Sequence, residues 1–298
     1  MRNKYKKILV VIVHFNDYKN LNKCLASLSR LKKPKDSIVE TVVIDNESNN
    51  VKLSKIMEMF PEVHFIAEKK NLGFSEGVNE GARYALANKM DYTLVSSPDL
   101  TMEPDVLSKL YTVLKNDKKL GAVGSKVLTR SKNPKIYFIG GVLDKIRKTS
   151  IHIGLNEVDK GQYREIDKFD FLNCPVLIKS EIFKKIGYLK KDFFLYYEDI
   201  DWYFRLKKEG YTLECVYDSV SWNENPQLNR DLYKRKAYYC SRNYLYFLIS
   251  NFSIVPITLA LIYELKDLLF IVKKILINPK KFSKSIDFYT LLGIKDFL

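Results

Sequence analysis

The sequence predicts an α/β fold in which helices flank a mostly parallel β-sheet, followed by a helical extension at the C-terminus. Short runs rich in β-branched residues alternate with stretches of helical period, which is typical of βαβ units. The first of these runs are apolar without interruption, as expected for parallel strands buried on both faces. Beyond Asn225 the alternation stops, and aromatic and aliphatic residues are interspersed with Lys and Arg, which predicts the extension.

The elements follow one another along the chain. Candidate strands are residues 8–13, 39–44, 63–67, 92–96 and 122–127. Two helices are predicted between these strands. The first has an apolar face of Leu21, Leu25 and Leu28. The second begins at Pro104 and has an apolar face of Val106, Leu107, Leu110, Val113 and Leu114. The alternation of strand and helix patterns weakens at 132–168, which is typical of binding loops or a lid. It returns with an apolar run at 169–178 and the helix that follows it.

Composition narrows the class of protein. A chain of 298 residues that is 46% apolar can bury a full core, and its formal charge of +15 attracts polyanions such as nucleic acid, anionic lipid or phosphorylated substrates. Cys24, Cys174, Cys215 and Cys240 are widely spaced, so they predict reduced cytoplasmic thiols rather than a zinc site or a disulfide framework. The apolar run after the basic start is too short for a signal peptide, so we interpret it as a buried strand.

The predicted extension, residues 226–298, holds 12 Lys and Arg against 5 Asp and Glu. Basic amphipathic helices on an anionic membrane surface have this character. The uncharged stretch 243–263 has the roughly 20 residues that a membrane span needs, although Ser250, Asn251, Ser253 and Pro256 argue against a span. A soluble helical subdomain and a homodimer surface are the alternatives.

The first polar cluster follows two candidate strands. Asn16 comes soon after residues 8–13, and Asp45 and Asn46 follow residues 39–44. Parallel strands end at one edge of their sheet, where a carboxylate can accept hydrogen bonds from a nucleotide base or ribose. We therefore assign Asp45 to nucleotide contact. Turn chemistry at a strand end is the alternative interpretation.

The second cluster is the segment 71–79, a predicted strand-to-helix turn with Ser75 near the helix cap. Glycines let the backbone approach a ligand, and a helix start offers N–H groups to phosphate. The spacing is not that of the NAD-binding fingerprint. Its candidate ligand-contacting residues are Asn71, Gly73, Phe74, Gly77 and Asn79.

Carboxylates supply two further clusters. Pro98 and Asp99 follow the strand candidate 92–96, and Asp99 can bind a divalent ion alone, because substrate phosphates and water complete the shell of such an ion. Glu198, Asp199 and Asp201 stand at a predicted helix start, where one of them can remove a proton from a hydroxyl. Like charges would raise the pKa of Asp199 and the helix dipole would oppose this. A Pro-Asp turn and helix capping are the structural alternatives.

In their joint order these segments resemble family 2 of the inverting glycosyltransferases, whose GT-A fold is a Rossmann-like, mostly parallel sheet flanked by helices. The matching elements are the strand that leads to Asn16, Asp-Asn-x-Ser at 45–48, Asn-x-Gly-Phe-x-x-Gly-x-Asn at 71–79, Pro-Asp at 98–99 and Phe-Phe-x-Tyr-x-Glu-Asp-x-Asp at 193–201. The resemblance covers about residues 8–222. It looks closest to bacterial rhamnosyltransferases of surface polysaccharide and cell wall synthesis.

The resemblance implies a role for each cluster. A nucleoside-diphosphate sugar, dTDP- or UDP-linked, would be the donor, and a glycan or lipid-linked oligosaccharide the acceptor. Asp45, Asn16, Asn46, Pro98 and the segment 71–79 would bind the donor, Asp99 would hold Mg²⁺ or Mn²⁺, and Asp199 would be the general base beside Glu198 and Asp201. Residues 1–225 would form the catalytic domain, with a donor half of about 1–128 and an acceptor half of about 129–225.

Three departures from the family pattern stand out. Ser97-Pro98-Asp99 replaces Asp-x-Asp, and Trp222 stands where relatives often have a histidine metal ligand. The sequence therefore does not define the full set of metal ligands. Asn173-Cys174-Pro175 replaces a customary glycine, which can alter the acceptor pocket. His14, His64 and His152 are not at the ligand position, and we expect them to be structural or surface residues.

Three rivals compete with a glycosyltransferase. A nucleic-acid-binding protein fits the charge and the 20 tyrosines, but the basic excess is dispersed and partly lies in the apolar extension. A nucleotidyltransferase would open with a glycine-rich basic loop, and an inactive GT-A scaffold would account for the missing histidine. We expect a cytoplasmic enzyme, peripheral on the inner face of the cell membrane, with no nucleic acid partner.

Overall fold

The computed structural model describes residues 5–48, 50–224, 230–277 and 285–297. The strands are β1 (Lys6–His14), β2 (Ser37–Asp45), β3 (His64–Ala67), β4 (Tyr92–Ser96), β5 (Leu100–Met102), β6 (Leu120–Thr129), β7 (Ile136–Phe138), β8 (Gly141–Leu143), β9 (Ser150–His152), β10 (Val176–Lys179) and β11 (Thr212–Asn223). The helices are α1 (Tyr18–Leu28), α2 (Asn50–Met59), α3 (Gly73–Ala87), α4 (Val106–Asn116), α5 (Glu181–Ile186), the 3₁₀ turn η1 (Lys191–Phe193), α6 (Glu198–Lys208), α7 (Arg230–Asn251), α8 (Ile254–Ile277) and α10 (Ile286–Phe297).

One large sheet forms the centre, in the order β3-β2-β1-β4-β10-β6-β11-β5, with β7 paired to β6. The first four strands are parallel, and so are β6 and β11. β10 is antiparallel to both β4 and β6, and β5 and β7 also pair antiparallel. The sheet is therefore more mixed than predicted, because β10 enters between two halves that are each built from parallel strands.

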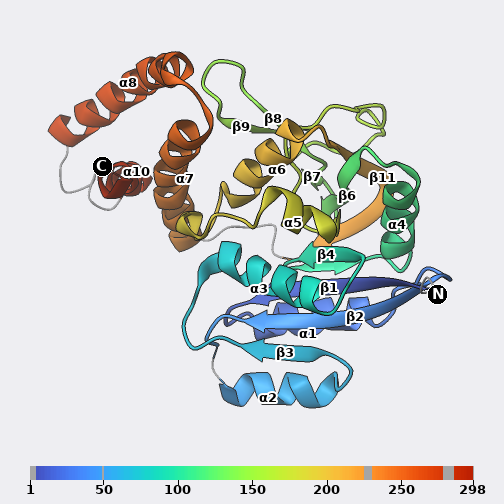
Figure 1. The fold of residues 1–298 in the computed structure, drawn as a ribbon. Helices are drawn as coiled ribbons and strands as arrows, with labels where there is room; N and C mark the ends of the chain where they lie inside the picture. The colour runs from blue at the N-terminus through green and yellow to red at the C-terminus, as the bar shows by residue number, and fades with distance from the viewer. Residues whose placement is uncertain (1–4, 49, 225–229, 278–284, 298) are drawn as a thin grey trace.

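Helices cover both faces of this sheet (Figure 1). Ile8, Val10 and Ile12 of β1 pack in one cluster with apolar residues of α1, α2 and α4, while Leu9 and Val11 pack toward α3 on the other face. Alternate residues of a strand point to opposite faces, so both sets of β1 side chains are buried. The uninterrupted apolar run at 8–13 reports this two-sided burial, as the sequence predicts.

The predicted strands are all present, and most boundaries agree within two residues. The weakly patterned region 132–168 holds the short strands β7, β8 and β9. α3 begins at Gly73, so Ser75, which we predicted to lie near the helix cap, is in its first turn; the side chain of the N-cap residue Leu72 makes no capping bond. Instead the Oδ1 atom of Asn71 accepts a hydrogen bond of 2.9 Å from the Gly73 N–H.

The C-terminal extension is helical, as predicted, and gathers at one side of the molecule (Figure 1). Its expected beginning at residue 226 lies outside the described residues. The stretch 243–263 is divided between α7 and α8 by a break at residues 252–253. Across the described part of the chain, no helix combines the length and apolar character that a bilayer crossing requires.

Candidate active site

The parallel strands β1, β2 and β4 end at the same edge of the sheet, where His14 lies opposite Asp45. His14 Nδ1 lies 2.9 Å from Asp45 Oδ1, and His14 Nε2 accepts a hydrogen bond from the Asp17 N–H. Nδ1 therefore carries the proton and donates it to Asp45. The Ser48 N–H donates to the other carboxylate oxygen of Asp45. Burial alone would raise the pKa of Asp45, but hydrogen bonds from His14 and Ser48 outweigh it and lower this pKa.

His14 is thus a buried structural residue, as the sequence predicts. Asp45 is equally buried, with both carboxylate oxygens engaged by protein, so its side chain shapes the strand end from within. Asn16 by contrast is exposed at the start of the following loop. Of this cluster, Asn16 is the exposed residue, and its Oδ1 accepts a hydrogen bond of 3.0 Å from the Tyr18 hydroxyl.

The start of α3 packs closely against its surroundings. Asn46 Nδ2 donates to the Gly73 carbonyl at 3.0 Å. A Cβ atom on Gly77 would lie 2.5 Å from Cγ1 of Val13, and one on Gly73 would lie 2.5 Å from the Phe194 carbonyl oxygen. Both glycines are therefore required for the approach of α3 to the sheet edge and to the segment before α6.

Asn79 links this helix to the second half of the chain. Its amide exchanges hydrogen bonds of 2.9 Å with the backbone N–H and C=O of Leu189. Its Nδ2 also donates to Glu76, and the side chain is buried. The Asn that ends the 71–79 motif thus fixes the segment that leads toward the acidic run.

Asp99 lies where β4 is followed by β5, with neutral partners. Ser97 Oγ donates to one carboxylate oxygen at 2.5 Å, and Asn223 Nδ2 donates to the other at 3.0 Å. Burial raises the pKa of Asp99, and the charge of Asp17 adds to this. Asp99 is partly buried and, among the described residues, has no cationic hydrogen-bond partner, which suits a divalent ion electrostatically.

Trp222, in the position where the resemblance places a histidine, points elsewhere. Its indole N–H donates to Glu103 at 2.6 Å, and the Arg130 guanidinium lies 4.5 Å from its ring. The residue that reaches Asp99 is the next one, Asn223. Sequence reasoning missed Asn223, because only the pairing of β11 with β5 brings it to Asp99.

Glu198 and Asp199 begin α6 as neighbouring carboxyl groups. Burial raises the pKa of Asp199 to about 6, although hydrogen bonds from the backbone of Ile200 and of Asp199 itself oppose the shift. Burial, and then the charge of Asp199, raise the pKa of Glu198 well above its usual range. Among the described residues Glu198 Oε2 has no hydrogen-bond partner. Asp199 is thus the member of the pair that ionises near neutral pH.

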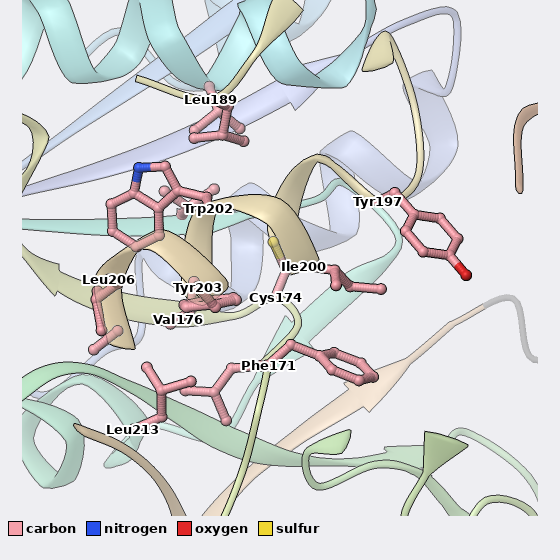
Figure 2. Packing of buried hydrophobic residues seen from close by; sticks show 14 of the residues in the cluster. Phe171, Cys174, Val176, Leu189, Tyr197, Ile200, Trp202, Tyr203, Leu206 and Leu213 are labelled. Carbon is pink, nitrogen blue, oxygen red and sulfur yellow. The ribbon is translucent and has the colours of Figure 1, made fainter. Parts of the chain in front are cut away.

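A cavity of about 40 Å³ adjoins Asp199, with Phe74 of α3, Asn173 and Trp202 in its lining. Figure 2 shows apolar side chains of α6 in the hydrophobic core, including Ile200, Trp202 and Tyr203; the last two also line the cavity. This packing supplies the low-dielectric surroundings that favour the protonated form of Asp199.

Asp201 has a different environment from its neighbours. It is fully buried and pairs with Lys190 at 2.8 Å and with Arg205 at 2.9 Å. Asn251 of α7 donates a third bond to it. The expectation that Asp201 raises the pKa of Asp199 by like charge is therefore wrong, because two cations neutralise it; burial is the cause instead.

The structure brings the two halves of the candidate site together at Cys174. Burial, followed by the charges of Asp199, Asp99 and Glu198, raises the pKa of the Cys174 thiol. Asp99 and Asp199 therefore both act on this buried thiol, although they come from opposite halves of the sequence. The candidate site therefore combines an aspartate at the sheet edge with a carboxylate of raised pKa at a helix start, both near Cys174.

Similarity to known proteins identifies the class of protein to which this fold and site belong. The family model described as "Glycosyl transferase family 2" matches residues 9–187. The chain belongs to glycosyl transferase family 2.

Two curated relatives are each similar over 71% of this chain. The low-salt glycan biosynthesis hexosyltransferase Agl10 of Haloferax volcanii is 26% identical, over 71% of this chain and 66% of the relative. The dTDP-rhamnosyl transferase RfbF of Shigella flexneri is 24% identical, over 71% of this chain and 67% of the relative. The chain thus matches about two thirds of each relative's length.

Solved structures confirm the GT-A fold expected from the sequence. The mannosyltransferase PcManGT from Pyrobaculum calidifontis, in complex with GDP-Man and Mn²⁺, has a TM-score of 0.62 at 13% identity and covers 98% of this chain and 87% of its own. GalNAc-T7 with UDP, GalNAc and Mn²⁺ has a TM-score of 0.60 at 15% identity and covers 75% and 44%. S. aureus TarS 1–349 in complex with UDP has a TM-score of 0.52 at 14% identity and covers 80% and 65%.

Proposed function

We propose that the chain is an inverting glycosyltransferase that moves a sugar from a nucleoside diphosphate to a hydroxyl group, with Asp199 as the general base. The observation that carries this is the carboxyl pair at the start of α6, in which burial raises the pKa of Asp199 to about 6. A base of this strength is ionised at neutral pH and still accepts a proton readily.

In the proposed reaction the acceptor hydroxyl oxygen attacks the anomeric carbon of the donor. Asp199 takes the hydroxyl proton as the new C–O bond forms. The bond between the anomeric carbon and the diphosphate oxygen breaks, and the nucleoside diphosphate leaves with the electron pair. Attack opposite the leaving group inverts the anomeric carbon, so one base is sufficient and no covalent enzyme intermediate is needed.

A divalent cation, Mg²⁺ or Mn²⁺, fits the surroundings of Asp99. The neutral partners Ser97 and Asn223 leave the charge of this carboxylate available for an ion. Within the described ranges no three His, Cys, Asp or Glu side chains form a metal-binding group, so the donor phosphates would supply most of the remaining ligands. When bound, the ion would neutralise charge that develops on the leaving diphosphate.

We propose a dTDP- or UDP-linked donor, with rhamnose as the first sugar to test, and a glycan or lipid-linked oligosaccharide of bacterial cell-surface polysaccharide as the acceptor. The similarity to RfbF, named a dTDP-rhamnosyl transferase, supports the first choice of donor. The similarity to Agl10, named for low-salt glycan biosynthesis, supports a glycan acceptor. Asn16, Asn71, Phe74, Pro98 and Asp99 are the predicted donor-binding residues that are not fully buried.

We also propose that the extension docks on an anionic lipid surface through α8. Apolar side chains are exposed along this helix, among them Ile254, Val255, Leu259, Leu261, Ile262, Leu265, Leu269 and Val272. The exposed Lys273 lies beside them, and the whole chain carries a formal charge of +15. Exposed apolar area next to positive charge complements an anionic bilayer interface. This surface would keep a lipid-linked acceptor near the active site on the inner face of the cell membrane.

A donor panel tests the proposed function. The protein is incubated with dTDP-, UDP- and GDP-linked sugars, with and without Mn²⁺, and nucleoside diphosphate release is measured in the presence of lipid-linked acceptors. We expect release from one nucleotide class that depends on acceptor and increases with Mn²⁺. If no donor yields nucleoside diphosphate under any of these conditions, the proposed function is contradicted.

A further inference from the structure

The segment that leads into α6, residues 192–197 and here called the base loop, has an unusual backbone. Phe194, Tyr196 and Tyr197 have φ angles of 61°, 66° and 69°. Non-glycine residues rarely adopt this left-handed conformation, and a run of them persists only where surrounding structure holds it in place. The base loop ends directly at Glu198 and Asp199, so whatever holds it also sets the direction in which these carboxyl groups enter the site.

Two side chains of α7 hold most of the base loop. Asn243 Nδ2 lies within 2.7 to 2.8 Å of the carbonyl oxygens of Phe193, Leu195 and Tyr196. A terminal nitrogen of Arg242 donates to the carbonyls of Asp192 and Phe193, at 2.7 and 3.0 Å. Four consecutive or near-consecutive carbonyls therefore depend on two adjacent residues of one helix.

The geometry at Asn243 suits an asparagine in particular. The side chain is fully buried, and its Oδ1 accepts a bond of 2.9 Å from Arg242 Nε. Because arginine can only donate, this bond orients the amide so that its NH₂ group faces the three carbonyls. An aspartate of the same shape would present an acceptor to three acceptors, and an alanine would leave all three without this partner.

Of the two other carbonyls of the base loop, Tyr197 O accepts from the Asp201 N–H within α6 and Phe194 O is bound by α3. Phe194 O accepts bonds from the backbone N–H groups of Phe74 and Ser75 in the first turn of α3, at 2.7 and 3.3 Å. The Phe194 ring stacks on Tyr239 of α7, with centroids 5.4 Å apart. The base loop therefore contacts the start of α3 on one side and α7 on the other.

We propose that Asn243 is a positioning residue for glycosyl transfer: from α7 it fixes the base loop so that Asp199 faces the donor held at the start of α3. This inference rests on the proposed function. It makes α7 part of the active site, although the family model ends at residue 187 and the sequence suggests a separable extension. Asn243 acts through the backbone of residues 193–196 and does not touch the reacting atoms.

The test compares Asn243→Ala and Asn243→Asp with wild type, and uses Ser250→Ala, an exposed position on the same helix, as the matched control. In folded Asn243→Ala we expect kcat to fall by about 10- to 100-fold, because small misplacement of a catalytic group has effects of this size. The Kd for the nucleoside diphosphate should change by less than about threefold, since Asn243 does not reach the donor side. Asn243→Asp should be at least as slow as the alanine variant.

A pH profile separates positioning from mere loss of stability. A looser base loop admits water to Asp199, so the acid limb of kcat should move to lower pH in Asn243→Ala, while a purely structural defect would lower only the amount of active protein. Should the alanine variant fail to fold, Arg242→Ala removes the orienting bond from a half-buried position and should give the same changes to a smaller degree.

An unchanged kcat and an unchanged acid limb in a folded Asn243 variant would overturn the positioning role. If the wild-type protein itself shows no glycosyl transfer, the proposed function is contradicted instead, so the two failures are distinguishable. The Ser250→Ala control should match wild type in kcat, Kd and pH profile.

Discussion

Neighbouring acidic residues of one run have different environments, and this difference assigns their roles. Asp199 stands half-buried beside a small cavity, whereas Asp201 is fully buried between two cations and an amide. Burial, and then the charge of Asp199, raise the pKa of Glu198 well above its usual range. Charge alone does not distinguish these carboxylates in the sequence, and the distinction comes from the packing of α6 against α5 and α7.

The raised pKa of Asp199 predicts the pH dependence of transfer. The base must be ionised to accept a proton, so the rate at saturating substrate should rise with pH and level off above a pKa of about 6. Below that value the rate should fall about tenfold per pH unit. The measurement is initial rate from pH 4.5 to 8 at fixed Mn²⁺. A rate independent of pH between 5 and 7 would contradict the assignment.

Asp201 should matter for stability. We expect Asp201→Asn to lower the free energy of unfolding by about 2–3 kcal/mol, because breaking a fully buried pair costs about 3–5 kcal/mol and both cations here keep some contact with solvent. Asp231→Asn, which breaks the exposed Asp231–Lys234 pair, is the control and should cost under about 1 kcal/mol. Urea unfolding of both variants checks this; equal losses would count against a structural role for Asp201.

At the scale of elements, α3 is the helix that connects the two halves of the candidate site. Its first turn donates two backbone N–H groups to Phe194 O, and Asn79 in its second turn bonds Leu189. The same motif that resembles a donor-binding segment therefore also fixes the approach to the acidic run. Gly73 and Gly77 of this motif allow close packing against Phe194 and Val13.

Gly73→Ala should impair both donor binding and transfer. The added Cβ would lie 2.5 Å from Phe194 O, and the φ of 80° is unfavourable for alanine. Gly210→Ala is the matched control, because Gly210 has a φ of 82° with no atom within 4 Å of a new Cβ. We expect at least a tenfold loss of transfer in Gly73→Ala. In Gly210→Ala we expect a stability loss of about 1 kcal/mol with normal kcat. Similar kcat in the two variants would refute the close-packing role.

Strands and helices could be predicted because two-sided burial and helical period each leave a local pattern in the sequence, as at residues 8–13 and 106–114. Contacts between residues that are distant in the sequence leave no such pattern. The antiparallel entry of β10, the bond from Asn223 to Asp99 and the three bonds of Asn243 each join residues that are distant in sequence. For the same reason Asp45 could be placed at the strand end, while its burial against His14 could not be foreseen.

At the scale of the whole molecule, the helices of the extension differ in what they contact. α10 packs on α7 so closely that a Cβ on Gly293 would lie 2.2 Å from the Tyr238 carbonyl oxygen. α7 in turn contacts the base loop, whereas α8 exposes apolar side chains. We infer that α7 and α10 complete the catalytic part and that α8 serves the lipid surface.

The double variant Ile262→Glu and Leu269→Glu tests the role of α8. Both side chains are more than half exposed, so the change should leave folding intact while placing two charges in the apolar face. We expect at least tenfold less flotation with phosphatidylglycerol vesicles than for wild type. Thr258→Glu, which adds a single charge at an exposed polar position of the same helix, should retain most of the binding. Equal flotation of all three proteins would contradict docking through α8.

The central claim is that Asp199 is the base, and Asp199→Asn tests it most directly. An amide keeps the size of the carboxyl group but cannot accept the hydroxyl proton, so kcat should fall by about 10²- to 10⁴-fold. The Kd for the nucleoside-diphosphate sugar, measured by calorimetry, should stay within about threefold of wild type because the donor site is untouched. Transfer at close to the wild-type rate, with donor binding intact, would contradict the account.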